Sequence, residues 1–413
     1  MFAYIEGKIK MEIGRRQSFE LPKRVGCTLL VLIVFLVGRN IVLYGVDVSS
    51  LQSQQTSAQD FVISILSGDR YRSSFFALGI TPYITASMLL LFIFVFFPNN
   101  VKKRISQQKM EMITMITAGI LSIVYAYVRS SELEYIKDNL YFDSFGLRLI
   151  AIISLTVGAF IIIGLMQLNK EHGIGQQLPI ILFNIIDGLY TTISGNITSI
   201  SYELVLICCE VVVITIIMEN VEVKVPIQRV SIDNIYADKS YIAFKLNPIG
   251  VMPVMFSTSI FLLIKYIIQF LCEVFPNVES LVWVNDHMNM NEVTGVWIYL
   301  LIIVFFTILF SFIMLSPDDL ARNLQRAGDS IVNVYAGKAT LRYFRFIIFI
   351  LSLISGFVMA CCMGISFFLA MHTNINQQVA MLPSSLMMLV SMFSNLLNEI
   401  KGYQKFDSYR FFF

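Results

Sequence analysis

Ten apolar runs, each long enough to cross a lipid bilayer, constrain this chain more than any single motif does. A helix needs roughly 20 residues to cross about 30 Å of hydrocarbon. Hydrophobic residues make up 56% of the chain and charged residues only 14%, so a water-soluble surface of ordinary charge density cannot be built. The sequence therefore predicts an integral membrane protein. The expected spans lie near residues 25–44, 75–97, 110–128, 147–168, 178–195, 200–218, 249–271, 296–315, 344–371 and 380–398.

Positive charges are distributed unevenly between the loops on the two sides of these spans. Most of the 30 Lys and Arg residues fall in one alternate set of loops. The other set holds only Arg70, Arg72, Arg129, Lys137 and Arg148. Because Lys and Arg accumulate in cytoplasmic loops, both termini are predicted to lie in the cytoplasm.

Residues 1–24 mix Lys, Arg and Glu with Phe, Ile and Met. This pattern favours a cytoplasmic amphipathic segment over a cleavable signal peptide. The six cysteines lack metal-ligand spacing, and no catalytic, phosphate-binding or dinucleotide motif occurs in a suitable context. We expect no enzyme activity, no cofactor, no metal and no nucleic-acid partner.

One short pattern occurs twice in the chain. Residues 76–87 and 247–258 each carry a Gly, a Pro three residues later, and small hydroxyl residues after the Pro. In a ten-span arrangement they are spans two and seven, which are equivalent positions in two five-span halves. Gly/Pro-interrupted segments in matching positions of two halves indicate a pathway at the repeat interface.

Four ionisable residues fall inside predicted spans: Arg39, Asp187, Glu210 and Lys265. Such groups are costly in hydrocarbon, so each is a functional candidate. Snorkelling to the membrane surface or an internal ion pair would explain them equally well. A proton-coupled secondary transporter that uses Asp187 and Glu210 also remains open.

Seven short blocks along the chain form a recognisable series. They are residues 21–38 (beginning Leu-Pro-Lys-Arg), 76–87 (Phe-Ala-Leu-Gly-Ile-Thr-Pro-Tyr-Ile-Thr-Ala-Ser), 103–107 (Lys-Arg-Ile-Ser-Gln), 170–175 (Lys-Glu-His-Gly-Ile-Gly), 225–228 (Val-Pro-Ile-Gln), 247–259 (Asn-Pro-Ile-Gly-Val-Met-Pro-Val-Met-Phe-Ser-Thr-Ser) and 316–328 (Ser-Pro-Asp-Asp-Leu-Ala-Arg-Asn-Leu-Gln-Arg-Ala-Gly). In this order, the blocks resemble those of the SecY family of protein-conducting channels.

The resemblance implies an all-α membrane protein whose ten helices form two inverted five-helix halves, arranged as a clamshell around an hourglass pore. Residues 25–199 would form the N-terminal half and 200–400 the C-terminal half. A cytoplasmic tail would follow at 401–413. Residues 60–74 would form a short plug helix before the second span.

Three groups of site residues follow from the resemblance. An apolar ring that closes the pore would contain Ile80, Ile84, Leu182, Ile186, Met255 and Met388. A lateral gate between spans two and seven would be lined by Thr85, Ser87, Ser257, Thr258 and Ser259. The plug would include Asp60, Ser67, Gly68, Arg70 and Arg72.

The resemblance also implies partners, because the chain has no ATP site of its own. Cytoplasmic loops 220–246 and 317–342 would receive the SecA motor ATPase or the ribosome. Small SecE-like and SecG-like membrane subunits, a secretory preprotein with its signal sequence, and membrane lipid would be the other partners. The candidate motor-binding residues are Lys224, Arg229, Arg326, Tyr335 and Lys338.

One departure from the family pattern suggests a subtype. Family members carry Gly-x-Arg-Pro-Gly in the second loop, whereas this chain has Tyr335 where the Arg belongs. We therefore expect the accessory SecY paralogue of a Gram-positive bacterium, located in the plasma membrane and exporting serine-rich glycoprotein adhesins. A general SecY channel from a divergent bacterium is the alternative.

Overall fold

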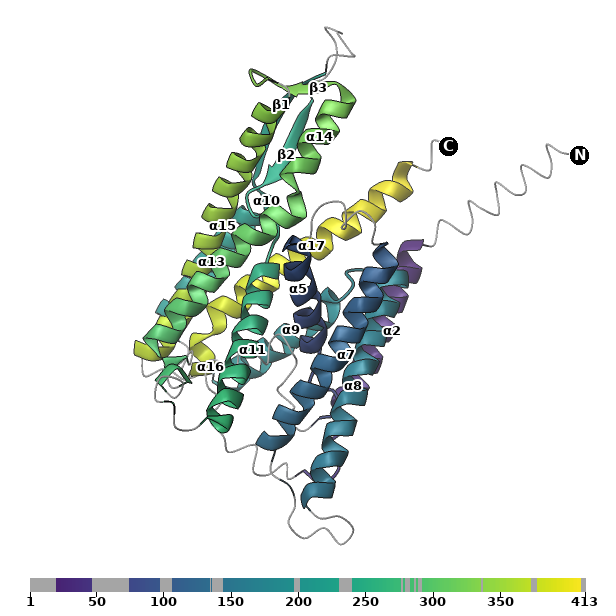
Figure 1. The fold of residues 1–413 in the computed structure, drawn as a ribbon, viewed down its shortest axis with the longest axis vertical. Helices are drawn as coiled ribbons and strands as arrows, with labels where there is room; N and C mark the ends of the chain where they lie inside the picture. Colours follow the sequence, from purple (N-terminus) through teal and green to yellow (C-terminus); the bar gives the residue numbers. More distant parts are fainter. Residues whose placement is uncertain are drawn as a thin grey trace, which may run out of the picture. The chain divides into compact units, whose positions relative to one another are not determined.

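The computed structural model describes residues 20–46, 74–96, 106–133, 135, 144–196, 201–229, 240–275, 278, 283–285, 287–288, 292–335, 337–372 and 377–409. The predicted plug residues Asp60, Ser67, Gly68, Arg70 and Arg72 lie outside these ranges. The described helices are α2 (Glu20–Arg39), α5 (Thr81–Phe96), α7 (Gln107–Glu132), α8 (Ser144–His172), α9 (Leu178–Gly195), α10 (Tyr202–Asn220), α11 (Met252–Val274), α13 (Val293–Leu315), α14 (Pro317–Ala327), α15 (Lys338–His372), α16 (Gln377–Ala380) and α17 (Leu382–Tyr409) (Figure 1). The strands are β1 (Glu222–Arg229), β2 (Tyr241–Lys245) and β3 (Asp329–Ile331).

Each of the predicted spans falls on one of these helices, so the prediction of a helical membrane protein is confirmed. Within the described ranges, seven helices are long and apolar enough to cross a membrane, namely α2, α7, α8, α9, α11, α13 and α15. Helix α5 has only 16 residues, and α10 carries Glu203, Glu210 and Glu219. The full set of ten spans therefore stays a prediction.

Two predicted spans extend by five or six residues beyond the helices that carry them. Helix α2 ends at Arg39, five residues before the predicted end at residue 44. Helix α5 begins at Thr81, six residues after the predicted start, because Gly79 has a φ of 53°. A residue in this left-handed region cannot continue a right-handed helix. Hydropathy alone does not detect such a break.

The chain divides into two compact units. The first contains α2, α5, α7, α8, most of α9 and the end of α17. The second contains the rest of α9, helices α10 to α16, the three strands and the beginning of α17. The predicted boundary between halves at residues 199 and 200 stays a prediction.

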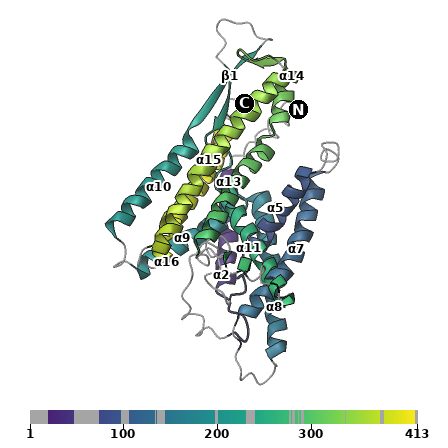
Figure 2. The same ribbon diagram turned by 60° about the vertical axis from the view of Figure 1, so that its left-hand side comes forward.

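Small residues bring the helices of the first unit close together. Helix α8 packs against both α2 and α7, and α7 packs against α5 (Figure 2). Ala86 of α5, Ala118 of α7 and Ile163 of α8 form one buried cluster. Without a hydrophobic driving force between helices in lipid, close packing at small side chains supplies much of the association energy.

A small layer of strands and helices stands at the ends of α10 and α15 in the second unit. Its sheet has the order β2-β1-β3, with both pairs antiparallel. Helix α14 begins with Pro317 and two acidic residues, and it ends at Ala327, followed by the C-cap residue Gly328, whose φ is 73°. These are the residue types that suit a helix start and a helix end.

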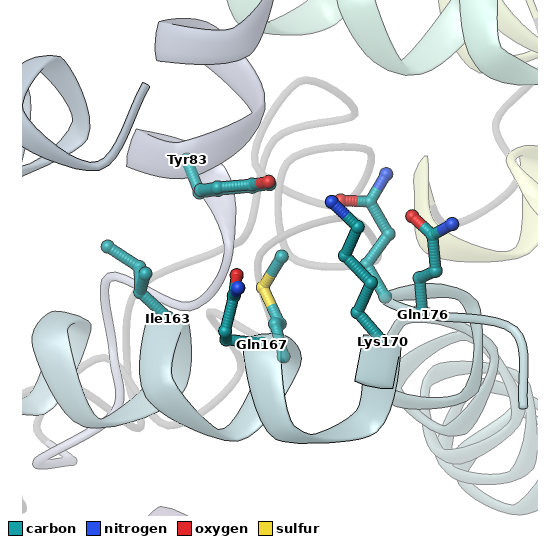
Figure 3. A pocket seen from close by; sticks show the side chains of 7 residues that line it. Tyr83, Ile163, Gln167, Lys170 and Gln176 are labelled. Atoms are coloured by element: carbon teal, nitrogen blue, oxygen red, sulfur yellow. The ribbon is translucent and has the colours of Figure 1, made fainter. Parts of the chain in front are cut away.

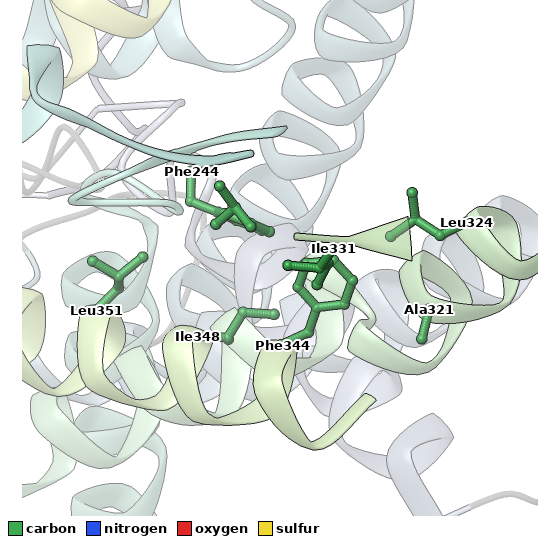
Figure 4. Packing of buried hydrophobic residues seen from close by; sticks show 8 residues of the cluster. Phe244, Ala321, Leu324, Ile331, Phe344, Ile348 and Leu351 are labelled. Atoms are coloured by element: carbon green, nitrogen blue, oxygen red, sulfur yellow. The ribbon is translucent and has the colours of Figure 1, made fainter. Parts of the chain in front are cut away.

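A continuous hydrophobic core joins this layer to the first turns of α15 (Figure 4). The rings of Phe244 on β2 and Phe344 on α15 lie 5.9 Å apart between their centroids. The buried members of this core, here called the loop core, are Val225, Phe244, Ala321, Leu324, Ile331, Phe344, Ile348 and Leu351. The loop core makes the two candidate motor-binding loops a single packed body.

We predict that Phe344→Ala will loosen this body. Phe344 is fully buried, and truncation of such a side chain costs about 3–5 kcal/mol. Hydrogen exchange at β1 and β2 in the purified protein should become faster. Phe346→Ala on the same helix is the matched control, because Phe346 is 62% exposed. Equal exchange in both variants would contradict the packing described here.

Candidate functional site

The two interrupted segments adopt the same backbone geometry. In the first, Gly79 has a φ of 53° and α5 begins two residues later, at Thr81. In the second, Gly250 has a φ of 70° and α11 begins two residues later, at Met252. A proline, Pro82 or Pro253, then occupies the second position of each helix. Proline suits a first helical turn, because the N–H it lacks would have no partner within the helix.

The first helix start is held against α2 and α8 by two glycines. A Cβ on Gly38 would lie 2.0 Å from the ring of Phe76, and one on Gly158 would lie 2.1 Å from the carbonyl oxygen of Phe75. The rings of Phe35 and Phe76 stack with centroids 6.0 Å apart. The turn before α5 therefore sits directly on the backbones of its neighbours, where no larger residue fits.

The second helix start is held instead by buried polar groups. The side-chain oxygen of Asn247 accepts hydrogen bonds from the Gly250 N–H at 3.2 Å and the Ser355 hydroxyl at 3.0 Å. The Asn247 amide donates to Glu219 Oε1 at 3.0 Å, and the Ser391 hydroxyl donates to the same oxygen. Residues from α10, α15 and α17 thus converge on the turn that begins α11.

Glu219 is the residue that sequence reasoning missed. The predicted span ends at residue 218 and so excludes Glu219, whereas α10 continues to Asn220 and Glu219 is only 1% exposed. A carboxylate at the last turn of an apolar helix was the available signal. Nothing in the sequence indicated that Asn247 and Ser391 would meet it.

The predicted ring residues differ in burial. Ile80, Ile84, Met255 and Met388 are buried, Leu182 is half-buried, and Ile186 is 46% exposed. Leu182 and Ile186 lie one turn apart on α9, and Ile80 immediately precedes α5. Met255 and Met388 belong to the second compact unit and the others to the first. Assembly of the ring stays a prediction.

The predicted gate hydroxyls mostly bond to the backbone of their own helices. Thr85 donates to Thr81 O at 2.9 Å, and Ser87 donates to Ile84 O at 2.8 Å. Ser257 donates to Pro253 O at 2.7 Å. Each of these hydroxyl groups therefore has a hydrogen-bond partner within its own helix, even in an apolar environment.

Thr258 also contacts a second helix. Its hydroxyl oxygen lies 2.9 Å from the Tyr299 hydroxyl on α13, and both residues are buried. Ser259 belongs to α11, but its side chain lies outside the described part of the structure. The gate as a whole stays a prediction.

The four ionisable residues of the predicted spans have different surroundings. Arg39 and Asp187 form an ion pair within the first unit. Glu210 is exposed on α10, and Lys265 is half-buried on α11. The internal ion pair weighed from the sequence is therefore present for Arg39 and Asp187.

A small polar pocket lies in the first unit between α5, α8 and the turn that follows α8 (Figure 3). Tyr83 of α5 faces Gln167 and Lys170 of α8 across it, with Gln176 beside them. The Lys170 ammonium pairs with the Glu111 carboxylate of α7. The pocket holds polar side chains without a nucleophile–base pair.

The candidate motor-binding residues are spread over the layer around the loop core. Lys224 on β1 lies over the Tyr241 ring, 4.7 Å from its centroid. Arg326 is exposed in the last turn of α14, and Lys338 begins α15. Tyr335, between β3 and α15, is 90% exposed. Arg229 ends β1, but its side chain lies outside the described residues.

The family model described as SecY matches residues 74–397. The accessory Sec system protein translocase subunit SecY2 of Streptococcus agalactiae is 25% identical over 389 residues, covering 92% of this chain and 93% of that protein. The protein of the same name from Leuconostoc gelidum subsp. gasicomitatum is 27% identical over 398 residues, covering 92% and 94%. The protein translocase subunit SecY of Lactococcus lactis subsp. lactis is 27% identical over 415 residues, covering 93% of each chain.

Solved structures agree on the fold. The structure described as that of a protein conducting channel superposes with a TM-score of 0.68 at 14% identity, covering 94% of each chain. Sec61 in the canine ribosome-channel complex superposes with a TM-score of 0.63 at 14% identity, again over 94% of each chain. The fold is therefore that of a helical membrane protein and is shared with these channel structures.

The chain belongs to the SecY family, since the family model covers most of its length. Its members are protein-conducting channels of the Sec translocon and are not enzymes. The resemblance drawn from seven short blocks is thereby confirmed, and the alternative of a proton-coupled secondary transporter is set aside.

We predict that Gly158→Ala will destabilise the first unit. The added Cβ must displace the Phe75 carbonyl, and overpacking of this kind costs about 1–3 kcal/mol. Gly164→Ala on the same helix is the control, because nothing lies within 4 Å of a Cβ there and alanine favours the helix. Thermal unfolding in detergent should occur at a lower temperature for Gly158→Ala only. Indistinguishable curves would contradict the close approach.

Proposed function

We propose that this chain is the channel of an accessory Sec system in the plasma membrane of a Gram-positive bacterium. It moves unfolded polypeptide across the membrane, and serine-rich glycoprotein adhesins are its cargo. Both termini lie in the cytoplasm, and ten spans form two inverted halves. The positive-charge distribution supports this orientation.

Exposed Tyr335 is the observation that carries the accessory assignment. Tyr335 lies in the connection between β3 and α15, which packs against the loop core. The Tyr335 side chain is 90% exposed. An Arg at this place would offer a permanent charge and several donors to a carboxylate on a partner, which tyrosine cannot do. Sequence identity alone does not distinguish an accessory from a general SecY channel, because relatives of both kinds are 25–27% identical to this chain.

A SecA-type motor paralogue, which supplies the energy, binds the layer around the loop core. Lys224, Arg229, Arg326, Tyr335 and Lys338 are its proposed contacts. Because the loop core packs both loops into one body, a motor can push against this body without deforming it. Small SecE-like and SecG-like subunits complete the channel in the membrane.

The pore is closed by the ring of Ile80, Ile84, Leu182, Ile186, Met255 and Met388. Apolar side chains close such a pore to ions by excluding water, whereas a charged filter would attract ions. The plug around residues 60–74 adds a second barrier. The lateral gate between α5 and α11 admits an apolar signal helix and lets it partition into lipid. Interrupted helix starts of the same geometry on both gate helices support this assignment.

We predict that Ile84→Asn will make the channel leak. A buried amide in the ring would hydrate the constriction, so ions should pass and cargo with a defective signal sequence should be exported. Leu90→Asn on the same helix is the control, because Leu90 is similarly buried but lies outside the ring. Ion flux and cargo export are measured in vesicles that contain each variant. Equal leak in the two variants would contradict the ring assignment.

We predict that the channel will work with an accessory SecA and poorly with a housekeeping SecA. Export of an adhesin fragment is measured in vesicles with each motor added separately. Tyr335→Arg should improve export with the housekeeping motor without affecting folding, since a residue this exposed contributes little packing.

Val332→Arg is the matched control for Tyr335→Arg, because Val332 is 41% exposed in the same connection. Equal export with both motors would contradict the accessory assignment. The assignment as a protein-conducting channel would stand.

A further inference from the structure

The ion pair between Arg39 and Asp187 joins two helices of the first compact unit. Arg39 is the last residue of α2, and Asp187 lies in the middle of α9. Nη2 of Arg39 donates to Oδ2 of Asp187. The Arg39 side chain is 6% exposed and that of Asp187 is 27% exposed. The two residues are 148 positions apart in the chain.

Two further contacts aim Arg39 at the same face of α9. Its Nη1 donates to Oδ1 of Asn184 at 3.5 Å. The Phe183 ring lies under the guanidinium, with its centroid 5.8 Å from the Arg39 Cζ atom. Residues 183, 184 and 187 share one side of a helix, because residues three and four apart are neighbours there. One arginine thus contacts two successive turns of α9.

The position of Asp187 makes an internal partner necessary. An arginine at the C-terminal end of a helix is favourable in itself, since it interacts with the helix dipole. A carboxylate in the middle of an apolar helix has no such benefit and is costly in hydrocarbon. Asp187 is therefore best explained by its contact with α2. Its sequence neighbour Ile186 and the preceding-turn residue Leu182 are the two ring residues that α9 contributes.

We propose that Arg39 and Asp187 are positioning residues that fix the rotation and tilt of α9, and through it the contribution of Leu182 and Ile186 to pore closure. This inference rests on the proposed function of the ring. Successive residues of a helix point about 100° apart. A helix whose charged face is anchored to α2 cannot turn its ring residues away from the constriction. Without the ion pair, α9 would be free to rotate about its axis. It would still present apolar side chains to lipid.

The test is ion leak through the full channel reconstituted in vesicles without cargo. An apolar double variant, Arg39→Met with Asp187→Leu, removes the anchor without leaving an uncompensated charge, and apolar replacements of a buried pair are generally tolerated. We expect it to fold and to leak several-fold more than the wild type. The reversed pair, Arg39→Glu with Asp187→Arg, restores the attraction and should bring the leak back towards the wild-type level.

The other described ion pair of the first unit between α7 and α8 provides the control. Lys170 and Glu111 are each 29% exposed in their side chains, and they lie on α8 and α7 rather than on α9. Lys170→Met with Glu111→Leu removes that pair in the same way and should leave the leak unchanged. Thermal unfolding is measured for every variant alongside the leak.

Three results would overturn the proposal. The apolar double variant could seal as tightly as the wild type, whatever its unfolding temperature, which would make the pair purely structural. The reversed pair could leak as much as the apolar double variant. The control pair could leak equally. The Ile84→Asn channel, measured in the same vesicles, separates two kinds of failure. If it leaks, the ring assignment stands and only the positioning role of Arg39 and Asp187 is wrong. If it also seals, the ring assignment itself is wrong.

Discussion

Hydrocarbon offers no water to a polar group, so every such group in a membrane-spanning segment must find its partner inside the protein. This constraint explains the commonest side-chain hydrogen bond of the described helices, in which a Ser or Thr donates to a carbonyl of its own preceding turn. It also explains why the buried ionisable groups Arg39 and Glu219 contact polar side chains of other helices and turns. The Arg39 guanidinium meets the Asp187 carboxylate, and Glu219 accepts from Asn247 and Ser391.

The same constraint makes the two helix starts informative. Each breaks the helical hydrogen-bond pattern at Gly79 or Gly250, and each break is stabilised by different means. Around Gly79 the turn is packed onto the glycines of α2 and α8, whereas Gly250 donates to the buried side chain of Asn247. One start is therefore fixed by shape and the other by polar contacts.

Family membership places these features in a channel. A protein-conducting pore must open for chains of varied side chains and still retain ions, which favours apolar closure held by rigid surroundings. The loop core gives the layer of strands and helices its rigidity through Phe244 and Phe344. The buried contacts of Arg39 and Glu219 give rigidity to helices that carry the proposed ring and gate residues. Tyr335, by contrast, is 90% exposed on this layer, where the proposed motor would contact it.

The sequence by itself determined the helical membrane class, the family and the duplicated Gly/Pro segments, because hydropathy, charge asymmetry and local turn chemistry are written into neighbouring residues. It marked Arg39 and Asp187 as costly charges, but only the tertiary structure paired them, since 148 positions separate them. It ended the predicted span one residue before Glu219, because the Asn247 and Ser391 side chains that bind this carboxylate are distant in sequence. Contacts of this kind are decided by packing, which no local pattern encodes.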